Sequence, residues 1–269
     1  MENNNSKIKL ITFISTILFS IILSVSKIIL DTKYLDSLSQ QYDLNASKYV
    51  LVLKIAIIVI SCLYILLLFF FKTKFSSSTE IVYTNTIKIS GILLVVLPII
   101  SLLSVLIFGL FTKNDSILYK LAYIISVILF VSSGLILFLY NKISASKPAL
   151  LLLLAITPIS YSVLFFFSSD YTINNLPRLI CCFAFIMFAL FFSFILKERS
   201  YDQKESKFSF IISQLGILYA LILIITDFYD LFVLKLKFTS LLVLELAIIP
   251  YLIIAINYSI KSLKNSYQK

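Results

Sequence analysis

Apolar runs long enough to cross a membrane follow one another along almost the whole chain, with short polar connections between them. A bilayer core is about 30 Å thick and is crossed by about 20 residues of α-helix. Runs that approach or exceed this length lie at 8–30, 49–71, 87–111, 118–140, 149–168, 179–196, 208–226 and 239–260. They predict an all-α fold, a polytopic transmembrane helical bundle of about eight spans.

The composition agrees with this prediction. The chain has 269 residues, of which 60% are hydrophobic and 13% are charged, whereas soluble domains are about 45 to 50% apolar and about 25% charged. No stretch of soluble composition reaches the roughly 40 residues below which domains rarely fold alone. We therefore predict a single integral membrane domain over residues 1–269, with the lipid bilayer as its surroundings, and we expect it in the cell membrane.

Lys and Arg residues indicate the orientation, because cytoplasmic loops retain them. With the N-terminus inside, most of the 23 Lys and Arg residues fall on the cytoplasmic side. Both termini are therefore predicted to be cytoplasmic. One alternative stays open, since Ser24-Val25-Ser26 resembles a signal-peptidase site at the end of the first run. Cleavage there would leave seven helices.

Several classes of function are excluded or disfavoured by what the chain lacks. The net charge is +10, but the basic residues are scattered between apolar runs, so we expect no nucleic-acid partner. The absence of His excludes imidazole catalysis and imidazole metal ligation. Neither a serine elbow nor a nucleotide-binding loop is present. No motif indicates a family, and we expect no cofactor.

Two charged residues stand inside apolar runs, Lys54 in the second and Glu245 in the eighth. Each lies about 7.5 to 9 Å along a helix from the predicted outer end of its span. A charge at the centre of a span costs roughly 2.5 to 3.5 kcal/mol, which favours a partner. We predict that the second and eighth helices are neighbours and that Lys54 pairs with Glu245. Alternatively, Lys54 reaches the interface with its long stem, and Glu245 is protonated or faces water.

Three prolines, Pro98, Pro158 and Pro250, fall near the middle of predicted spans. Each leaves the carbonyl group four residues earlier without its helical donor. Three such carbonyls at one depth could outline a polar chamber, which Tyr161 and Gln214 would also face. The alternative is that these are ordinary kinked helices.

Small residues recur at helical spacing in two runs. The first run carries Thr12, Thr16, Ser20 and Ser24, and the seventh carries Ser209, Ser213, Gly216 and Ala220. Such stripes let helices approach closely and form hydrogen bonds with each other, so we predict packing faces.

Paired carboxylates beside the predicted outer surface occur at Asp227 and Asp230. Spaced by three residues, they would share a helix face and could hold Mg²⁺ against a lipid diphosphate, with Asp31 and Asp36 as a second acidic group. They could equally be solvated.

The sequence therefore predicts a permease-like or channel-like component for a small solute or ion. Its predicted path comprises Lys54, Glu245, Pro98, Pro158, Pro250, Tyr161 and Gln214. The first alternative is a non-catalytic accessory protein for assembly, immunity or sensing, which binds a membrane partner or a second copy through its small-residue faces. The second alternative is a lipid-modifying membrane enzyme that uses Asp227 and Asp230.

Overall fold

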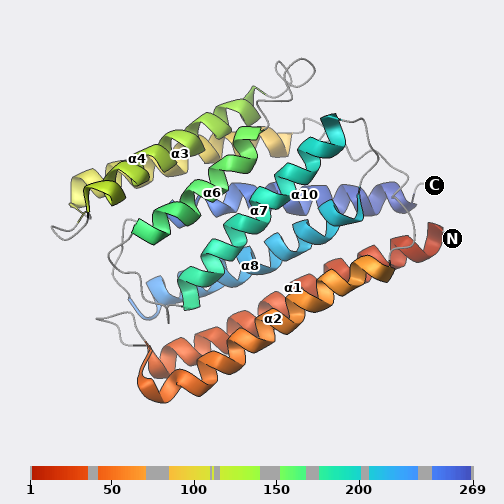
Figure 1. Cartoon of the computed structure of the whole chain (residues 1–269), viewed down its shortest axis with the longest axis horizontal. Coiled ribbons are helices and arrows are strands. Elements are labelled where there is room, and N and C mark those ends of the chain that lie inside the picture. The colour runs from red at the N-terminus through yellow and green to blue at the C-terminus, as the bar shows by residue number, and fades with distance from the viewer. Residues whose placement is uncertain are drawn as a thin grey trace.

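The computed structural model describes residues 2–35, 42–70, 85–109, 111, 116–139, 152–167, 176–200, 206–235 and 244–267. These residues are almost entirely helical, and within the described ranges the only β-type contact is an isolated bridge between Leu35 and Tyr42. The all-α prediction is confirmed (Figure 1).

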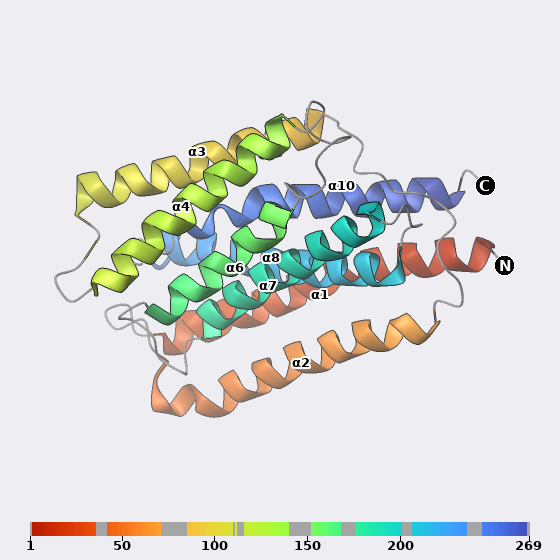
Figure 2. The same cartoon turned by 45° about the horizontal axis from the view of Figure 1, so that its top comes forward.

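The described helices are long rods laid side by side (Figures 1 and 2). They are α1 (Glu2–Tyr34), the short 3-10 helix η1 (Leu44–Ala46), α2 (Ser47–Phe70), α3 (Asn85–Phe108), α4 (Ile117–Phe138), α6 (Leu152–Phe167), α7 (Leu176–Ser200), α8 (Lys207–Phe232) and α10 (Ile248–Tyr267). Both chain termini lie at the same end of the bundle, as an even number of crossings requires. Their cytoplasmic location stays a prediction.

Six helices are long and apolar enough to cross a membrane, which is typical of an integral membrane protein. They span Ser6–Tyr34, Ser47–Phe69, Asn85–Phe108, Ile117–Phe138, Leu179–Glu198 and Lys207–Phe232. Helix α6 is apolar but shorter, and the second half of α10 carries Asn257, Lys261 and Lys264. The predicted total of eight spans is therefore plausible, with six supported by length and composition.

The bundle has apolar side chains on its outside, and polar side chains are buried inside it together with the apolar core. Large apolar residues such as Val52, Leu106 and Ile117 are exposed, whereas Thr16 and Gln214 are fully buried. In water this arrangement would be unfavourable, but in lipid the outward residues meet acyl chains and the polar groups must find partners within the protein. The distribution therefore fits a bilayer environment.

Helix α8 lies at the centre of the bundle. It packs against α7, α1, α10 and α2, while α3 and α4 pair with each other and reach the rest through α10 and α6. Because neighbours surround it, α8 is buried over most of its length. The predicted packing faces on α1 and α8 are both used inside the chain. Helix α1 also continues unbroken through Ser24-Val25-Ser26.

The predicted eighth span is interrupted beside Glu245. A turn follows this residue and separates it from α10, which begins at Ile248. Pro250 therefore lies in the first turn of α10, where its missing N–H is not needed. The carbonyl oxygen of Leu246 accepts a hydrogen bond from the N–H of Ile249 at 3.1 Å.

Candidate functional site

One face of α1 is polar along nearly its whole length and is turned into the protein. Its side chains recur every three or four residues, which places them on one side of a helix. All are at most 2% exposed: Ser6, Lys9, Thr12, Thr16, Ser20, Ser24, Lys27 and Asp31. We call this row the polar seam, and we include in it the buried polar residues Ser209 and Gln214 of α8 and Tyr258 and Ser259 of α10.

The middle of the polar seam is a hydrogen-bond network that joins four helices. Thr16 donates to the side-chain oxygen of Gln214 on α8 at 3.1 Å and is also paired with the hydroxyl of Tyr64 on α2 at 2.8 Å. The amide nitrogen of Gln214 donates to Ser259 on α10 at 2.8 Å. Gln214 therefore ties α1 to α10 through α8.

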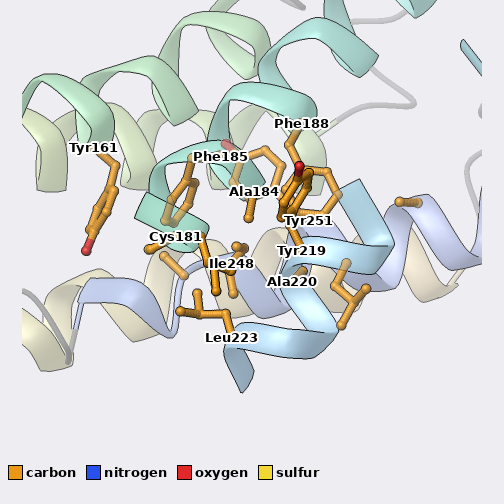
Figure 3. Close-up of a cluster of buried hydrophobic side chains, with 14 of the residues drawn as sticks. Tyr161, Cys181, Ala184, Phe185, Phe188, Tyr219, Ala220, Leu223, Ile248 and Tyr251 are labelled. Atoms are coloured by element: carbon orange, nitrogen blue, oxygen red, sulfur yellow. The ribbon is translucent and has the colours of Figure 1, made fainter. Parts of the chain in front are cut away.

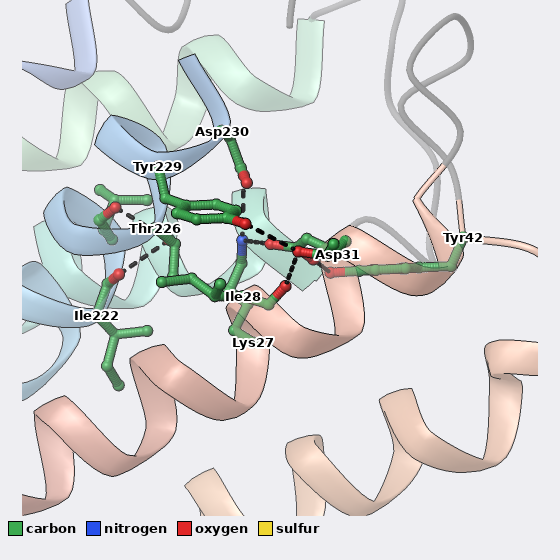
Figure 4. A network of polar contacts seen from close by, with 10 residues as sticks. Lys27, Ile28, Asp31, Tyr42, Ile222, Thr226, Tyr229 and Asp230 are labelled. Atoms are coloured by element: carbon green, nitrogen blue, oxygen red, sulfur yellow. Dashed lines mark hydrogen bonds and ion pairs between the residues drawn. The ribbon is translucent and has the colours of Figure 1, made fainter. Parts of the chain in front are cut away.

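A buried ion-pair network (Figure 4) lies near the C-terminal end of α1, which is the end of that helix away from the chain termini in Figure 1. The ammonium group of Lys27 is 2.5 Å from a carboxylate oxygen of Asp31 and 3.6 Å from one of Asp230 on α8. Lys27 is completely buried, and Asp230 is only 6% exposed. Separation of these charges inside the bundle would leave an unpaired buried ion, so the network joins α1 firmly to α8.

Tyr42, from the connection that follows α1, covers this network. Its hydroxyl donates a hydrogen bond of 2.5 Å to the second carboxylate oxygen of Asp31. The chain is held in position there by a hydrogen bond from the N–H of Asp43 to the carbonyl oxygen of Tyr34. Burial, and then the negative charge of Asp31, raise the pKa of Tyr42, so its hydroxyl stays protonated and remains a donor.

Glu245 extends the network toward α6 and α7. The hydroxyl of Tyr161 donates to Glu245 at 2.6 Å, and Asp227 on α8 lies nearby. Cys181 on α7 is buried close to Tyr161. Tyr161 stacks on Phe185 with ring centroids 4.4 Å apart, at the edge of the aromatic core shown in Figure 3.

Three carboxyl groups, those of Asp31, Asp227 and Asp230, thus lie around the ammonium group of Lys27, and Glu245 lies near Asp227. We call Asp31, Asp227, Asp230 and Glu245 the carboxylate cluster; its cation among the described side chains is Lys27. One positive charge cannot balance four negative ones in a medium of low dielectric constant, where like charges close together cannot all stay ionised. The cluster therefore holds more acidic groups than cations among the described side chains.

The predicted ion pair between Lys54 and Glu245 is not formed. Lys54 is half-buried on α2 and makes no ion pair with any described residue, while Glu245 binds Tyr161. Helix α2 packs against α1 and α8, whereas α10 packs against α3, α8, α1 and α7. The sequence predicted that Lys54 and Glu245 lie at a similar depth in the membrane. Depth alone does not determine toward which neighbouring helix each side chain points, so the two residues did not meet.

The other residues of the predicted path lie in different parts of the bundle. Gln214 lies in the polar seam and Tyr161 beside the carboxylate cluster, whereas Pro98 and Pro158 are buried within α3 and α6. Near Pro158 the hydroxyls of Thr157 and Ser133 bond to each other at 2.6 Å, which links α6 to α4. With Pro250 at a helix start, the three prolines do not outline one chamber.

The Mg²⁺ hypothesis for Asp227 and Asp230 gains no support from the geometry. The carboxylate of Asp230 faces Lys27 at 3.6 Å. The described part of the chain holds no group of three or more acidic, Cys or His residues arranged to bind a metal. Asp36, predicted as a further ligand, lies outside the described residues.

Lys27 is a buried charged residue that the sequence-based predictions did not identify. The sequence pattern did indicate it. Lys27 lies three residues after Ser24, and Asp31 lies four residues after Lys27, so both continue the helix face formed by the small residues of α1. Extension of that row would have identified a polar face with charged ends.

No protein-family model, characterised protein or solved structure matches this chain.

Proposed function

We propose that the chain is a permease-like component of the cell membrane. Its route is the polar seam between α1, α8 and α10, and its ion-binding end is the carboxylate cluster. The solute is a proton or a small cation, because the cluster carries excess negative charge. This location of the path replaces the one predicted around Lys54 and the three prolines.

The interruption of the last predicted span at a buried carboxylate is the observation that carries the proposal. Glu245 is 7% exposed and is followed directly by a turn instead of a continuous helix. Non-helical backbone at membrane depth is tolerated where protein or a polar cavity satisfies it. In transporters, broken helices of this kind supply the groups that coordinate ions and substrates.

The polar seam is closed in this conformation, because its side chains are buried and bonded to one another. Ser209 pairs with Tyr258 at 2.8 Å, and Gln214 holds both Thr16 and Ser259. Passage therefore requires these bonds to exchange for bonds to the solute or to water. Such hydrogen bonds average only about 0.6 kcal/mol each in membrane proteins, so the exchange is energetically accessible.

The accessory-protein alternative loses the surface on which it relied. The small-residue faces of α1 and α8 are occupied inside the chain, so a membrane partner would need another surface. The lipid-enzyme alternative likewise loses its predicted pair of metal ligands, because the carboxylate of Asp230 is paired with Lys27. Neither alternative is favoured by a specific contact.

The proposal is tested by ion flux through purified protein in liposomes. An imposed pH gradient, followed by an enclosed pH-sensitive dye, should collapse faster with the protein than in empty liposomes. Asp230→Asn should remove most of that flux, because it removes an ionisable group from the cluster. Lys54→Met is the matched control and should retain it, since Lys54 lies outside the seam.

Repetition with sodium or potassium gradients identifies the solute. Flux of any of these ions that depends on Asp230 supports the proposal. No flux above empty liposomes for proton, sodium and potassium would overturn it.

A further inference from the structure

We infer that Asp230 is a binding site for a monovalent metal cation, sodium or potassium, which takes the place of the Lys27 ammonium group there. As the cation binds, Lys27 withdraws to Asp31 on its own helix. That this cation is the transported solute rests on the proposed function, whereas its binding at Asp230 does not.

Two carboxylates share the ammonium group of Lys27 unequally. Its nitrogen is 2.5 Å from Oδ2 of Asp31, with which it forms a hydrogen bond, but 3.6 Å from Oδ2 of Asp230, which is beyond hydrogen-bonding range. The other oxygen of Asp31 accepts the hydrogen bond from Tyr42. Both oxygens of Asp31 are therefore bonded, and Asp230 is the carboxylate whose charge is less completely compensated.

The second oxygen of Asp230 adds an independent observation. This Oδ1 atom is buried and accepts no hydrogen bond from the described residues, and the side chain is only 9% exposed. Figure 4 shows the carboxylate directed into the network toward Lys27. A buried carboxylate with an unpartnered oxygen is costly, so the site favours a ligand that brings positive charge to Asp230.

The two partners of Lys27 lie on different helices. Asp31 is on α1, one helical turn after Lys27, whereas Asp230 is on α8. Movement of α1 away from α8 would therefore keep Lys27 paired with Asp31 and would leave Asp230 without its cation. A solute cation at Asp230 removes the cost of that unpaired charge, so cation binding and separation of the two helices favour each other.

The ligand set is suited to weak binding of a monovalent cation. A divalent cation such as Ca²⁺ takes about six to eight oxygen ligands, several of them from carboxylates. The described residues contain no group of three or more Asp, Glu, His or Cys side chains that could hold a metal ion. A transported ion must also bind weakly enough to leave, which one buried carboxylate allows.

Thermal unfolding of the full-length protein in a neutral detergent tests the site without any need for transport. Sodium chloride or potassium chloride is titrated against N-methyl-D-glucamine chloride at constant ionic strength. Both salts should raise the unfolding temperature of the wild-type protein, because a ligand of the folded state stabilises that state. Asp230→Asn should abolish this response. Asp43→Asn, at an exposed carboxylate in the α1–α2 connection, should leave it unchanged.

Lys27→Arg covers the case that Asp230→Asn does not fold. This variant keeps the positive charge, but its guanidinium group has several N–H donors in a fixed fork and can bond to Asp31 and Asp230 together. The added hydrogen bond competes with the cation. The cation concentration that gives half of the response should therefore rise at least about tenfold. A Lys27→Arg variant with the wild-type response would overturn the exchange.

Two further results would overturn the inference: sodium and potassium that stabilise no more than N-methyl-D-glucamine, or a response that survives Asp230→Asn. A cation response without any flux in liposomes would contradict the proposed function and leave the site standing. Flux that depends on Asp230 without a cation response would overturn the site and leave the proposed function standing.

Discussion

At the scale of single residues, Lys27 is the side chain on which the cluster depends. Its full burial is tolerated because Asp31 lies one helical turn away and Asp230 faces it from α8. Loss of one partner from a buried ion pair is more damaging than loss of the whole pair, because the remaining charge has no solvent.

Lys27→Met should therefore destabilise the protein by about 3–5 kcal/mol, the usual cost of leaving a buried charge unpaired. Unfolding in mixed micelles by increasing denaturant detergent measures this change. Lys54→Met, at a half-buried lysine without an ion pair, should alter the unfolding free energy by less than about 0.5 kcal/mol. Equal effects of the two variants would show that Lys27 is not held as described.

Tyr42→Phe should cost about 1.5–3 kcal/mol at neutral pH, because the hydroxyl donates to the charged Asp31. The pKa of Tyr42 is raised in the folded protein, so its contribution to stability is complete below the ordinary tyrosine pKa of about 10 and is lost as the pH rises above it. The difference in unfolding free energy between wild type and variant should narrow above about pH 10. A difference that widens there would contradict the assignment.

At the scale of helices, α3 and α4 approach each other closely at two glycines. A Cβ atom on Gly91 would lie 2.7 Å from the backbone nitrogen of Phe138 and 2.9 Å from the carbonyl oxygen of Gly134. Backbone atoms cannot move aside as a side chain can. The two helices can therefore lie this close only because both positions are glycine.

Gly134→Ala should lower stability by about 1–3 kcal/mol, the usual cost of overpacking, because the new methyl group forces α3 away from α4. Ser132→Ala, a small change on the same helix at a residue that bonds only to its own backbone, is the control. Thermal unfolding of both variants in one detergent gives the comparison. A Gly134 variant as stable as the control would show that the two helices are not in contact here.

Gln214→Leu separates a packing role of the polar seam from a transport role. Loss of two hydrogen bonds between membrane helices should reduce stability by only about 1 kcal/mol. If the seam is the route, however, the liposome flux should fall far more than this small destabilisation explains. A variant that is less stable but carries wild-type flux would show that the Thr16–Gln214–Ser259 contacts serve packing alone.

At the scale of the whole molecule, the bundle was predictable and the site was predictable only in part. Bilayer thickness determines the length of an apolar helix, so the apolar runs predict the helices well. The length of a run does not reveal the direction in which a helix faces, which is why Glu245 was correctly placed in the interior but paired with the wrong residue. The turn after Glu245 was missed because the apolar run continues through it without interruption.

Access of water to the polar face of α1 tests the central claim most directly. In a protein with Cys62, Cys181 and Cys182 replaced, a cysteine at Ser20 in the seam is compared with one at Leu18 on the lipid-exposed side of the same helix. We predict that a membrane-impermeant, water-soluble thiol reagent labels the Ser20→Cys variant in liposomes and leaves the Leu18→Cys variant unlabelled. A Ser20→Cys variant that is as unreactive as Leu18→Cys would contradict the claim, because it would show that the seam does not open to a water-soluble molecule.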